Sequence, residues 1–239
     1  ATITDATEVF ATDTRTNSEG EGKYDSGFPV DFSIARTFDA TSNSFALTRL
    51  TNTHLKTNSD GDASTSVGDV AWDVMDGFTI GGSGLNAFFG GSTDNINWMW
   101  KRAKGFFDVV AYTGTGSART VAHGLGVVPE MMWLKRRDSA VQWIVYHSGA
   151  VSSSPEDYYL MLNENSAATD GSITFNDTAP TSSVFTVGGH AWANADGGTY
   201  IAYLFATLAG VSKLGSVTHS GSSTDVDCGF SAGARFVLL

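Results

Sequence analysis

Cysteine is nearly absent from this chain, and its scarcity narrows the possible chemistry. Cys228 is the single cysteine among 239 residues, so an intrachain disulfide and a cysteine zinc cluster are both excluded. The five histidines show no metal-ligand spacing, and there is no Gly-x-Ser-x-Gly elbow or phosphate-binding loop. We therefore expect no metal, no cofactor and no enzymatic activity, with Cys228 as a small buried residue.

Charged residues are also scarce, at 16% of the chain, and positive charge is the scarcer sign. The chain has 14 Lys and Arg against 25 Asp and Glu, which gives a formal net charge of −11. Nucleic-acid phosphates and anionic membrane surfaces both attract basic residues. No apolar run reaches the roughly 18 residues that a spanning helix needs. We expect neither nucleic acid as a partner nor insertion into a membrane.

Proline is rare, with 4 residues, whereas glycine is frequent, with 27. Helical periodicity never extends beyond one turn, and bulky or β-branched runs end at glycine and polar turns. This pattern predicts an all-β fold with two packed sheets per unit. Residues 198–205 are apolar without alternation, which is typical of a strand covered on both faces. The other strands expected in the second half are residues 130–137, 141–147, 158–162, 172–175, 184–187, 213–218 and 223–227.

Several motifs occur twice, mostly about 105 residues apart, which indicates one structural unit used in tandem. Small drifts in the spacing are expected where loops differ in length. The paired motifs are Phe78-Thr79-Ile80-Gly81-Gly82 with Phe185-Thr186-Val187-Gly188-Gly189, Trp98-Met99-Trp100 with Tyr203-Leu204-Phe205, Leu55 and Asn58 with Leu160 and Asn163, Gly116, Val121 and Gly124 with Gly221, Val226 and Gly229, and Phe28–Phe32 with Val128–Met132.

The repeat predicts how the chain is divided. We expect an extended arm or linker at residues 1–26, a β-sandwich unit of lectin or jelly-roll type at 27–126 and a second at 127–231. Residues 232–239 are expected to be the first strand of a further copy, because Ala234–Leu239 aligns with Pro129–Leu134. Since no Met precedes Ala1 either, the chain is expected to be part of a longer polypeptide.

Aromatic residues beside polar ones are the candidates for ligand binding. Trp192 lies in a polar, turn-rich loop with Asn194 and Asp196, and Tyr158 belongs to the same aromatic set. Aromatic faces can stack on pyranose rings while Asn and Asp bind hydroxyls, so these four residues are the predicted glycan site. The alternative for such aromatics is a place in the core. Trp100 and Trp133 are expected in the core, because apolar residues replace them at the equivalent positions.

The clusters of charged residues are explained mainly by turns and solvated strand edges, and less well by metal binding or catalysis. Asp60-Gly61-Asp62 and Asn163-Glu164-Asn165 lack the twelve-residue calcium pattern, and turn chemistry explains their composition equally well. Glu156-Asp157 is a poor pair for glycoside hydrolysis, because adjacent carboxylates on a strand point to opposite faces. Lys135-Arg136-Arg137 is expected to form a solvated hairpin edge.

The junction between the repeats resembles that of repeated domains in bacteriophage tail proteins. Ala122-His123-Gly124-Leu125-Gly126-Val127-Val128-Pro129-Glu130 is similar to their "His-x-Leu-Gly-x-x-Pro-Glu" junction, and Gly198–Ala206 to their "Thr-Tyr-Val-Ala-Trp-x-Trp" strand. Phe185–Gly188, Leu55–Ser59 and the run from Gly105 to Gly116 resemble further elements, and several of these motifs occur in the family's order. Tyr203 and Phe205 depart from the family by replacing tryptophans.

The resemblance implies a component of the virion tail or fibre, with other virion proteins as partners and without assigned catalytic residues. The leading hypothesis is a non-enzymatic tail-fibre segment that displays β-sandwich units and attaches to a host-surface glycan. Weak binding sites that are repeated on several chains would together bind with high avidity. The resemblance also implies a homo-oligomer, for which fibres of this type suggest a trimer. The alternatives are a purely structural spacer, baseplate or capsid-decorating protein, a depolymerase, and a secreted bacterial adhesin.

Overall fold

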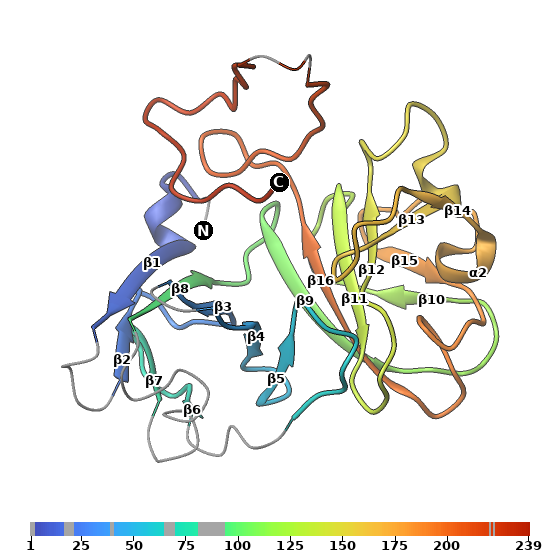
Figure 1. The fold of residues 1–239 in the computed structure, drawn as a ribbon, viewed down its shortest axis with the longest axis horizontal. Coiled ribbons are helices and arrows are strands. Elements are labelled where there is room, and N and C mark those ends of the chain that lie inside the picture. Colours follow the sequence, from blue (N-terminus) through green and yellow to red (C-terminus); the bar gives the residue numbers. More distant parts are fainter. Residues whose placement is uncertain are drawn as a thin grey trace.

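The computed structural model describes residues 3–16, 22–38, 41–64, 70–80, 94–219, 221 and 223–239. Its regular structure is almost entirely antiparallel β-sheet, which confirms the predicted all-β class. Helical turns occur at η1 (Ala6–Glu8), η2 (Pro155–Asp157) and α2 (Ser172–Phe175). The strands form two groups that lie side by side, coloured blue to green and green to orange (Figure 1).

The first group of strands, β1 to β8, forms one sandwich, which we call the first unit. A five-stranded sheet with the order β1-β8-β3-β4-β5 packs on a three-stranded sheet with the order β2-β7-β6. Between them lies a core that includes Phe78 and Leu47, both almost fully buried. The strands are β1 (Phe10–Arg15), β2 (Gly22–Asp25), β3 (Phe32–Thr37), β4 (Ser44–Thr48), β5 (Thr53–Lys56), β6 (Val70–Ala71), β7 (Gly77–Ile80) and β8 (Asn95–Trp100).

The second unit is built from β9 to β16. A six-stranded sheet with the order β14-β13-β12-β11-β16-β9 faces the pair β10-β15. Tyr200, Ala202 and Leu204 of β16 point into the core between these sheets. The strands are β9 (Phe107–Thr113), β10 (Arg119–Ala122), β11 (Met131–Arg136), β12 (Ile144–His147), β13 (Tyr158–Met161), β14 (Thr169–Asp170), β15 (Val184–Val187) and β16 (Thr199–Phe205).

The two units share the same topology over seven strands each, with β6 and β14 as additions. The order β1-β8-β3-β4-β5 corresponds to β9-β16-β11-β12-β13, and the pair β2-β7 corresponds to β10-β15. The details recur as well, because Asp31 before β3 accepts the Arg102 N–H at 2.8 Å and Glu130 before β11 accepts the Thr207 N–H at 2.8 Å. Two tandem β-sandwich units are therefore present, as the repeated motifs predict. The pair Gly81-Gly82 of that repeat lies outside the described residues.

The registers correct one alignment of the repeat. Phe32 pairs with Trp100 in the first unit, whereas Met131 pairs with Phe205 in the second. Asp31 is therefore equivalent to Glu130, and the spacing here is one residue shorter than the match of Pro29 with Pro129 suggests. The loop before β3 and β11 absorbs this difference, as loops commonly do.

The large sheets of the two units face each other across a third core, which we call the shared core. Its aromatic rings meet directly, since the Phe32 ring lies 4.5 Å from the Tyr203 ring and 5.5 Å from the Phe107 ring, centroid to centroid. Strands β3, β8, β11 and β16 are consequently covered on both faces, which confirms the prediction for residues 198–205. The buried residues of the shared core are Val9, Phe10, Phe32, Ile34, Ala46, Leu55, Trp100, Phe106, Phe107, Val109, Trp133, Trp143, Val145, Ile201, Tyr203 and Phe205.

The prediction that residues 1–26 form an extended arm or linker is wrong, because most of their described part belongs to the first unit. Strand β1 joins the edge of the five-stranded sheet by pairing with β8, and β2 pairs with β7. Val9 and Tyr24 are almost fully buried. The sequence of this segment is polar because β1 is an edge strand that exposes Thr12 and Thr14. Its pairing partner, β8, lies far away in the sequence, so no nearby pattern indicates that a strand forms here.

The boundary between the units also differs from the predicted one at residue 126. Strands β9 and β10 pair with β16 and β15, so they belong to the second unit. The change from one unit to the next falls between β8 and β9. The junction motif at residues 122–130 is instead the link between β10 and β11 within the second unit.

Three segments expected to be strands take other conformations. Residues 172–175 form the short helix α2, because this turn buries Thr174 and places the Phe175 ring 5.6 Å from the Tyr146 ring. Residues 213–218 and 223–227 form no strand.

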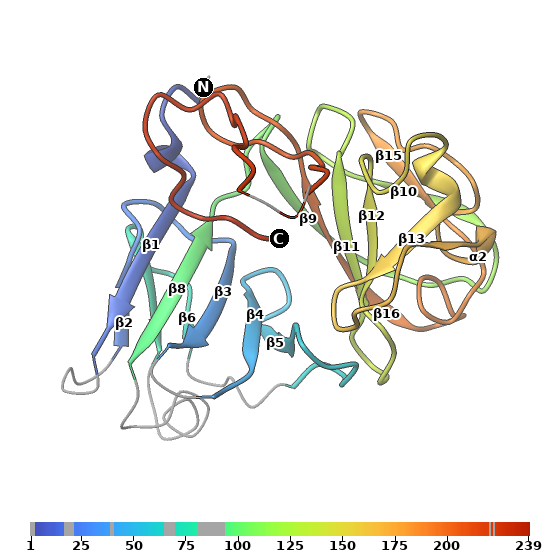
Figure 2. The same ribbon diagram turned by 45° about the horizontal axis from the view of Figure 1, so that its top comes forward.

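The final stretch at 232–239 is irregular too, so the predicted first strand of a further copy is absent there. A strand forms only where another strand pairs with it, as β9 pairs with β16 and β10 with β15 in the second unit. Among the described residues, no further strands are present that could pair with residues 207–239 in the same way. We call residues 207–239 the C-terminal segment. It runs across one end of both units, beside η1 (Figure 2).

Candidate functional site

The loop between β15 and β16 carries three of the four predicted glycan-binding residues. Asn194 is fully buried in it. Its Oδ1 accepts the Thr115 N–H at 2.9 Å, and its Nδ2 donates to the Ser117 oxygen at 2.6 Å. The side chain thus clamps the β9–β10 turn, and both of its polar ends are occupied. Asn194 is a structural residue in this fold.

The remaining predicted residues do not converge with Asn194. Trp192 is partly buried, with its ring 6.0 Å from the Tyr159 ring and 4.6 Å from the His190 ring. Tyr158 precedes Tyr159 on β13 and therefore faces the opposite side of the sheet. Asp196 is exposed. The described contacts give these four residues no common binding surface.

The loop with the sequence Asp60-Gly61-Asp62 is held by an internal ammonium group. Lys135 is fully buried, and its Nζ donates to the Asp60 oxygen at 2.9 Å and to the Val141 oxygen at 2.7 Å. Burial lowers the pKa of this amine to about 8, against the attraction of Asp60 and Asp62. The prediction of a solvated edge is therefore wrong for Lys135. The sheet places it inward, at the boundary between the units.

The matching loop of the second unit is a structural turn. The Oδ1 of Asn163 accepts the Trp143 N–H at 3.0 Å, just as the Oδ1 of Asn58 accepts the Ser44 N–H at 3.4 Å. Across the described residues, no group of three or more His, Cys, Asp or Glu side chains could hold a metal ion. Side-chain packing and turn formation account for both loops.

Glu156 and Asp157 lie in the helical turn η2 and not on a strand. The pKa of Asp157 is raised by desolvation and by the neighbouring carboxylates of Asp177, Glu156 and Asp170. These neighbouring negative charges repel one another at the surface. This arrangement gives no support to hydrolysis of a glycosidic bond.

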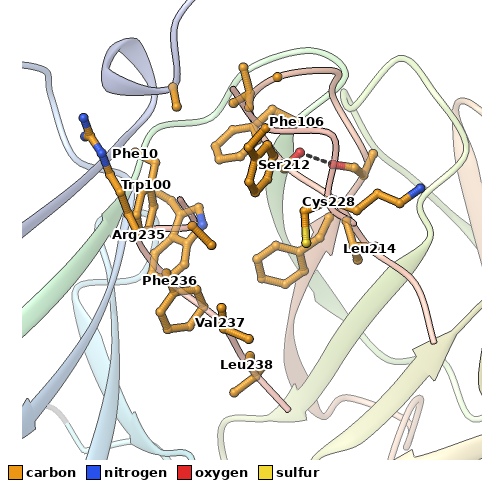
Figure 3. A pocket seen from close by; sticks show the side chains of 18 of the residues that line it. Phe10, Trp100, Phe106, Ser212, Leu214, Cys228, Arg235, Phe236, Val237 and Leu238 are labelled. Atoms are coloured by element: carbon orange, nitrogen blue, oxygen red, sulfur yellow. Dashed lines mark hydrogen bonds between the residues drawn. The ribbon is translucent and has the colours of Figure 1, made fainter. Parts of the chain in front are cut away.

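A cavity of about 510 Å³ opens where the C-terminal segment crosses the end of the shared core. Figure 3 shows Phe10, Trp100 and Phe236 on one side of it, with Phe106, Leu214 and Cys228 on the other. These residues come from η1–β1, β8, the link to β9 and the C-terminal segment, so no local motif marks the site. Its signal in the sequence is limited to aromatic positions that also serve the core. Cys228, expected to be buried, is partly exposed at its rim.

The described helices include none long and apolar enough to cross a membrane. Comparison with curated proteins and with solved structures gave no match. Residues 7–239 do match a family described as a domain of unknown function, DUF7483. The match includes β1, both sandwich units and the C-terminal segment. The chain therefore belongs to the DUF7483 family.

Proposed function

We propose that this chain is a non-enzymatic structural module of a virion appendage, such as a tail fibre, and that it serves as a rigid spacer. The shared core is the observation that carries this proposal. Two sandwiches that bury aromatic side chains against each other behave as one body, because separating them would expose those side chains to water.

Polar contacts across the same boundary favour a fixed orientation of the units. The Trp143 indole N–H donates to the Lys56 oxygen at 2.8 Å, and the Ala63 N–H donates to the Arg137 oxygen at 2.8 Å. Hydrogen bonds are directional, whereas apolar packing alone is less so. Together with the Lys135 contact, they oppose rotation of one sandwich on the other. A spacer that transmits force needs this resistance.

Glycan attachment, the leading expectation from the sequence, now has less support than the spacer role. The four residues predicted for it do not form one surface. Of the six tryptophans, Trp72, Trp100, Trp133 and Trp143 are at most 7% exposed. Side chains buried in a core cannot stack on a sugar. We keep virion proteins as the proposed partners and a homo-oligomer, such as a trimer, as the proposed assembly.

Purified particles of the phage that encodes this sequence test the proposal. We expect mass spectrometry to find the chain in the particles, and we expect an antibody against the recombinant chain to label an appendage in electron micrographs. In parallel, the recombinant chain should bind no glycan on an array and release no reducing ends from host polysaccharide. Absence of the chain from the particles would refute the virion role. Specific glycan binding would refute the spacer role and restore attachment.

A further inference from the structure

The floor of the cavity is the uncovered end of the shared core. Phe10 and Trp100 come from the first unit, and Phe106, Trp133 and Phe205 from the second unit and the link before it. Each of these side chains is less than 10% exposed. The rings of Phe10 and Trp100 lie 5.0 Å apart and edge to face, so this side is already well packed. The floor is preformed by residues that the fold needs in any case.

The roof is the C-terminal segment, and its anchor is Phe236. The Phe236 ring lies 6.0, 5.5 and 5.4 Å from the rings of Phe10, Trp98 and Trp100. Among the described residues, Asp225–Leu239 make no hydrogen bond to either unit. Gly229 N–H donates to Asp227 Oδ1 at 2.8 Å, within the segment itself. In the described part of the chain, residues 225–239 of the roof therefore lack hydrogen bonds to either unit, whereas Thr207 at its start is fixed to Glu130. The end of the roof can open locally at lower cost in free energy than its start.

Three of the polar residues that line the cavity are occupied within the protein or turned away from it. Ser212 Oγ donates to the Ala206 oxygen at 2.7 Å and accepts the Leu208 N–H at 2.9 Å. His147 Nδ1 accepts the Gly149 N–H at 2.9 Å. Figure 3 shows the Arg235 guanidinium directed away from the space. A charged ligand would lose its hydration against the aromatic part of the lining, which is costly.

We propose that this cavity binds an uncharged aromatic small molecule, held by the shared-core rings below and by Phe236 above. Its volume of about 510 Å³ lies within the range of small-molecule sites, which are mostly apolar and aromatic. Aromatic rings on both sides favour a flat ring system by stacking and edge contacts. This site is separate from the spacer role and does not depend on it.

The uncharged dye N-phenyl-1-naphthylamine is the probe for this site, used with the full chain. We expect saturable binding of one dye per chain, seen as a rise in dye fluorescence. 1-Naphthalenemethanol should displace the dye, while 2-naphthalenesulfonate, with the same rings and a negative charge, should do so at least about tenfold less well. Equal competition by the sulfonate, or no saturable binding, would overturn the proposal.

Two variants locate the binding. Cys228→Trp places a large ring in the cavity and should weaken dye binding at least about tenfold. Val226→Trp is the matched control, because Val226 lies two residues away, is 58% exposed and does not line the cavity. It should bind the dye like the parent chain. If Cys228→Trp fails to fold, Phe236→Ala replaces it and should also weaken binding. Unchanged binding in the folded cavity variant would place the dye elsewhere and overturn the proposal.

Discussion

The Lys135 ammonium of the second unit donates a 2.9 Å hydrogen bond to the main-chain oxygen of Asp60 in the first unit. It is a buried charge at the boundary between two copies of one fold, and only carbonyl oxygens accept its described hydrogen bonds. Burial disfavours the charged amine and lowers its pKa to about 8, from an ordinary 10.5. The contact therefore ties the docking of the units to pH.

The first prediction concerns this amine at alkaline pH. Between the folded pKa of about 8 and the unfolded value of 10.5, the unfolded chain binds more protons than the folded one. The free energy of unfolding contributed by Lys135 should therefore rise as pH increases through this window, by at most roughly 3 kcal/mol. Urea unfolding of the parent chain and of Lys135→Met at pH 7.5, 9 and 10 measures it. A difference between the two proteins that does not change with pH would contradict the assignment.

The second prediction concerns His54 in acid. His54 is 3% exposed, and burial, with a smaller effect of Lys56, lowers its pKa from 6.5 to about 4. As pH falls from 6.5 to 4, the unfolded chain takes up a proton that the folded chain refuses. The parent chain should lose up to roughly 3 kcal/mol more than His54→Gln over this range. Parallel acid curves for the two proteins would show that His54 is not the group responsible.

The third prediction separates a structural Asn194 from a binding one. Asn194→Ala leaves the Thr115 N–H and the Ser117 oxygen without their partner. The loss should be about 1–3 kcal/mol in chemical unfolding. Asp196→Ala is the control in the same loop and, being exposed, should stay within about 0.5 kcal/mol of the parent. Equal stability of all three proteins would reopen a binding role for Asn194.

Repeated residue patterns predict the tandem units well, because both copies need the same apolar positions to fill equivalent cores. Phe185-Thr186-Val187 lies within β15, and Leu55 and Leu160 occupy matching places on β5 and β13. Local patterns predict less well where the partner is distant. Strand β1 reads as a polar linker, yet β8 supplies its pairing far along the chain.

The candidate site escapes prediction for the same reason. Asn194 looks like an exposed loop residue until the Ser117 oxygen, 77 residues away, is placed beside it. Lys135 belongs to a basic run typical of a surface, and burial follows only from the docking of the units. The cavity depends on where the C-terminal segment crosses the shared core. The sequence of the C-terminal segment is similar to that of strands in the second unit. Strands form from such a sequence only where partner strands are available for pairing.

The fourth prediction concerns the shared core itself. Phe32→Ala removes a fully buried ring that contacts Tyr203 and Phe107 of the other unit. It should cost about 3–5 kcal/mol and should separate the unfolding of the two units in calorimetry. Phe78→Ala is the matched control, because this ring is equally buried but lies within the first unit alone. It should destabilise the protein without uncoupling the second unit. If the two units unfolded separately in both variants, the shared core would not be what couples their unfolding.

Differential scanning calorimetry of the parent chain tests most directly whether the shared core makes two sandwiches one rigid body. We predict a single transition whose calorimetric enthalpy equals the van't Hoff enthalpy, as expected when all layers unfold together. Two separate transitions, each with the enthalpy of one sandwich, would show that the units are independent and would contradict the spacer proposal.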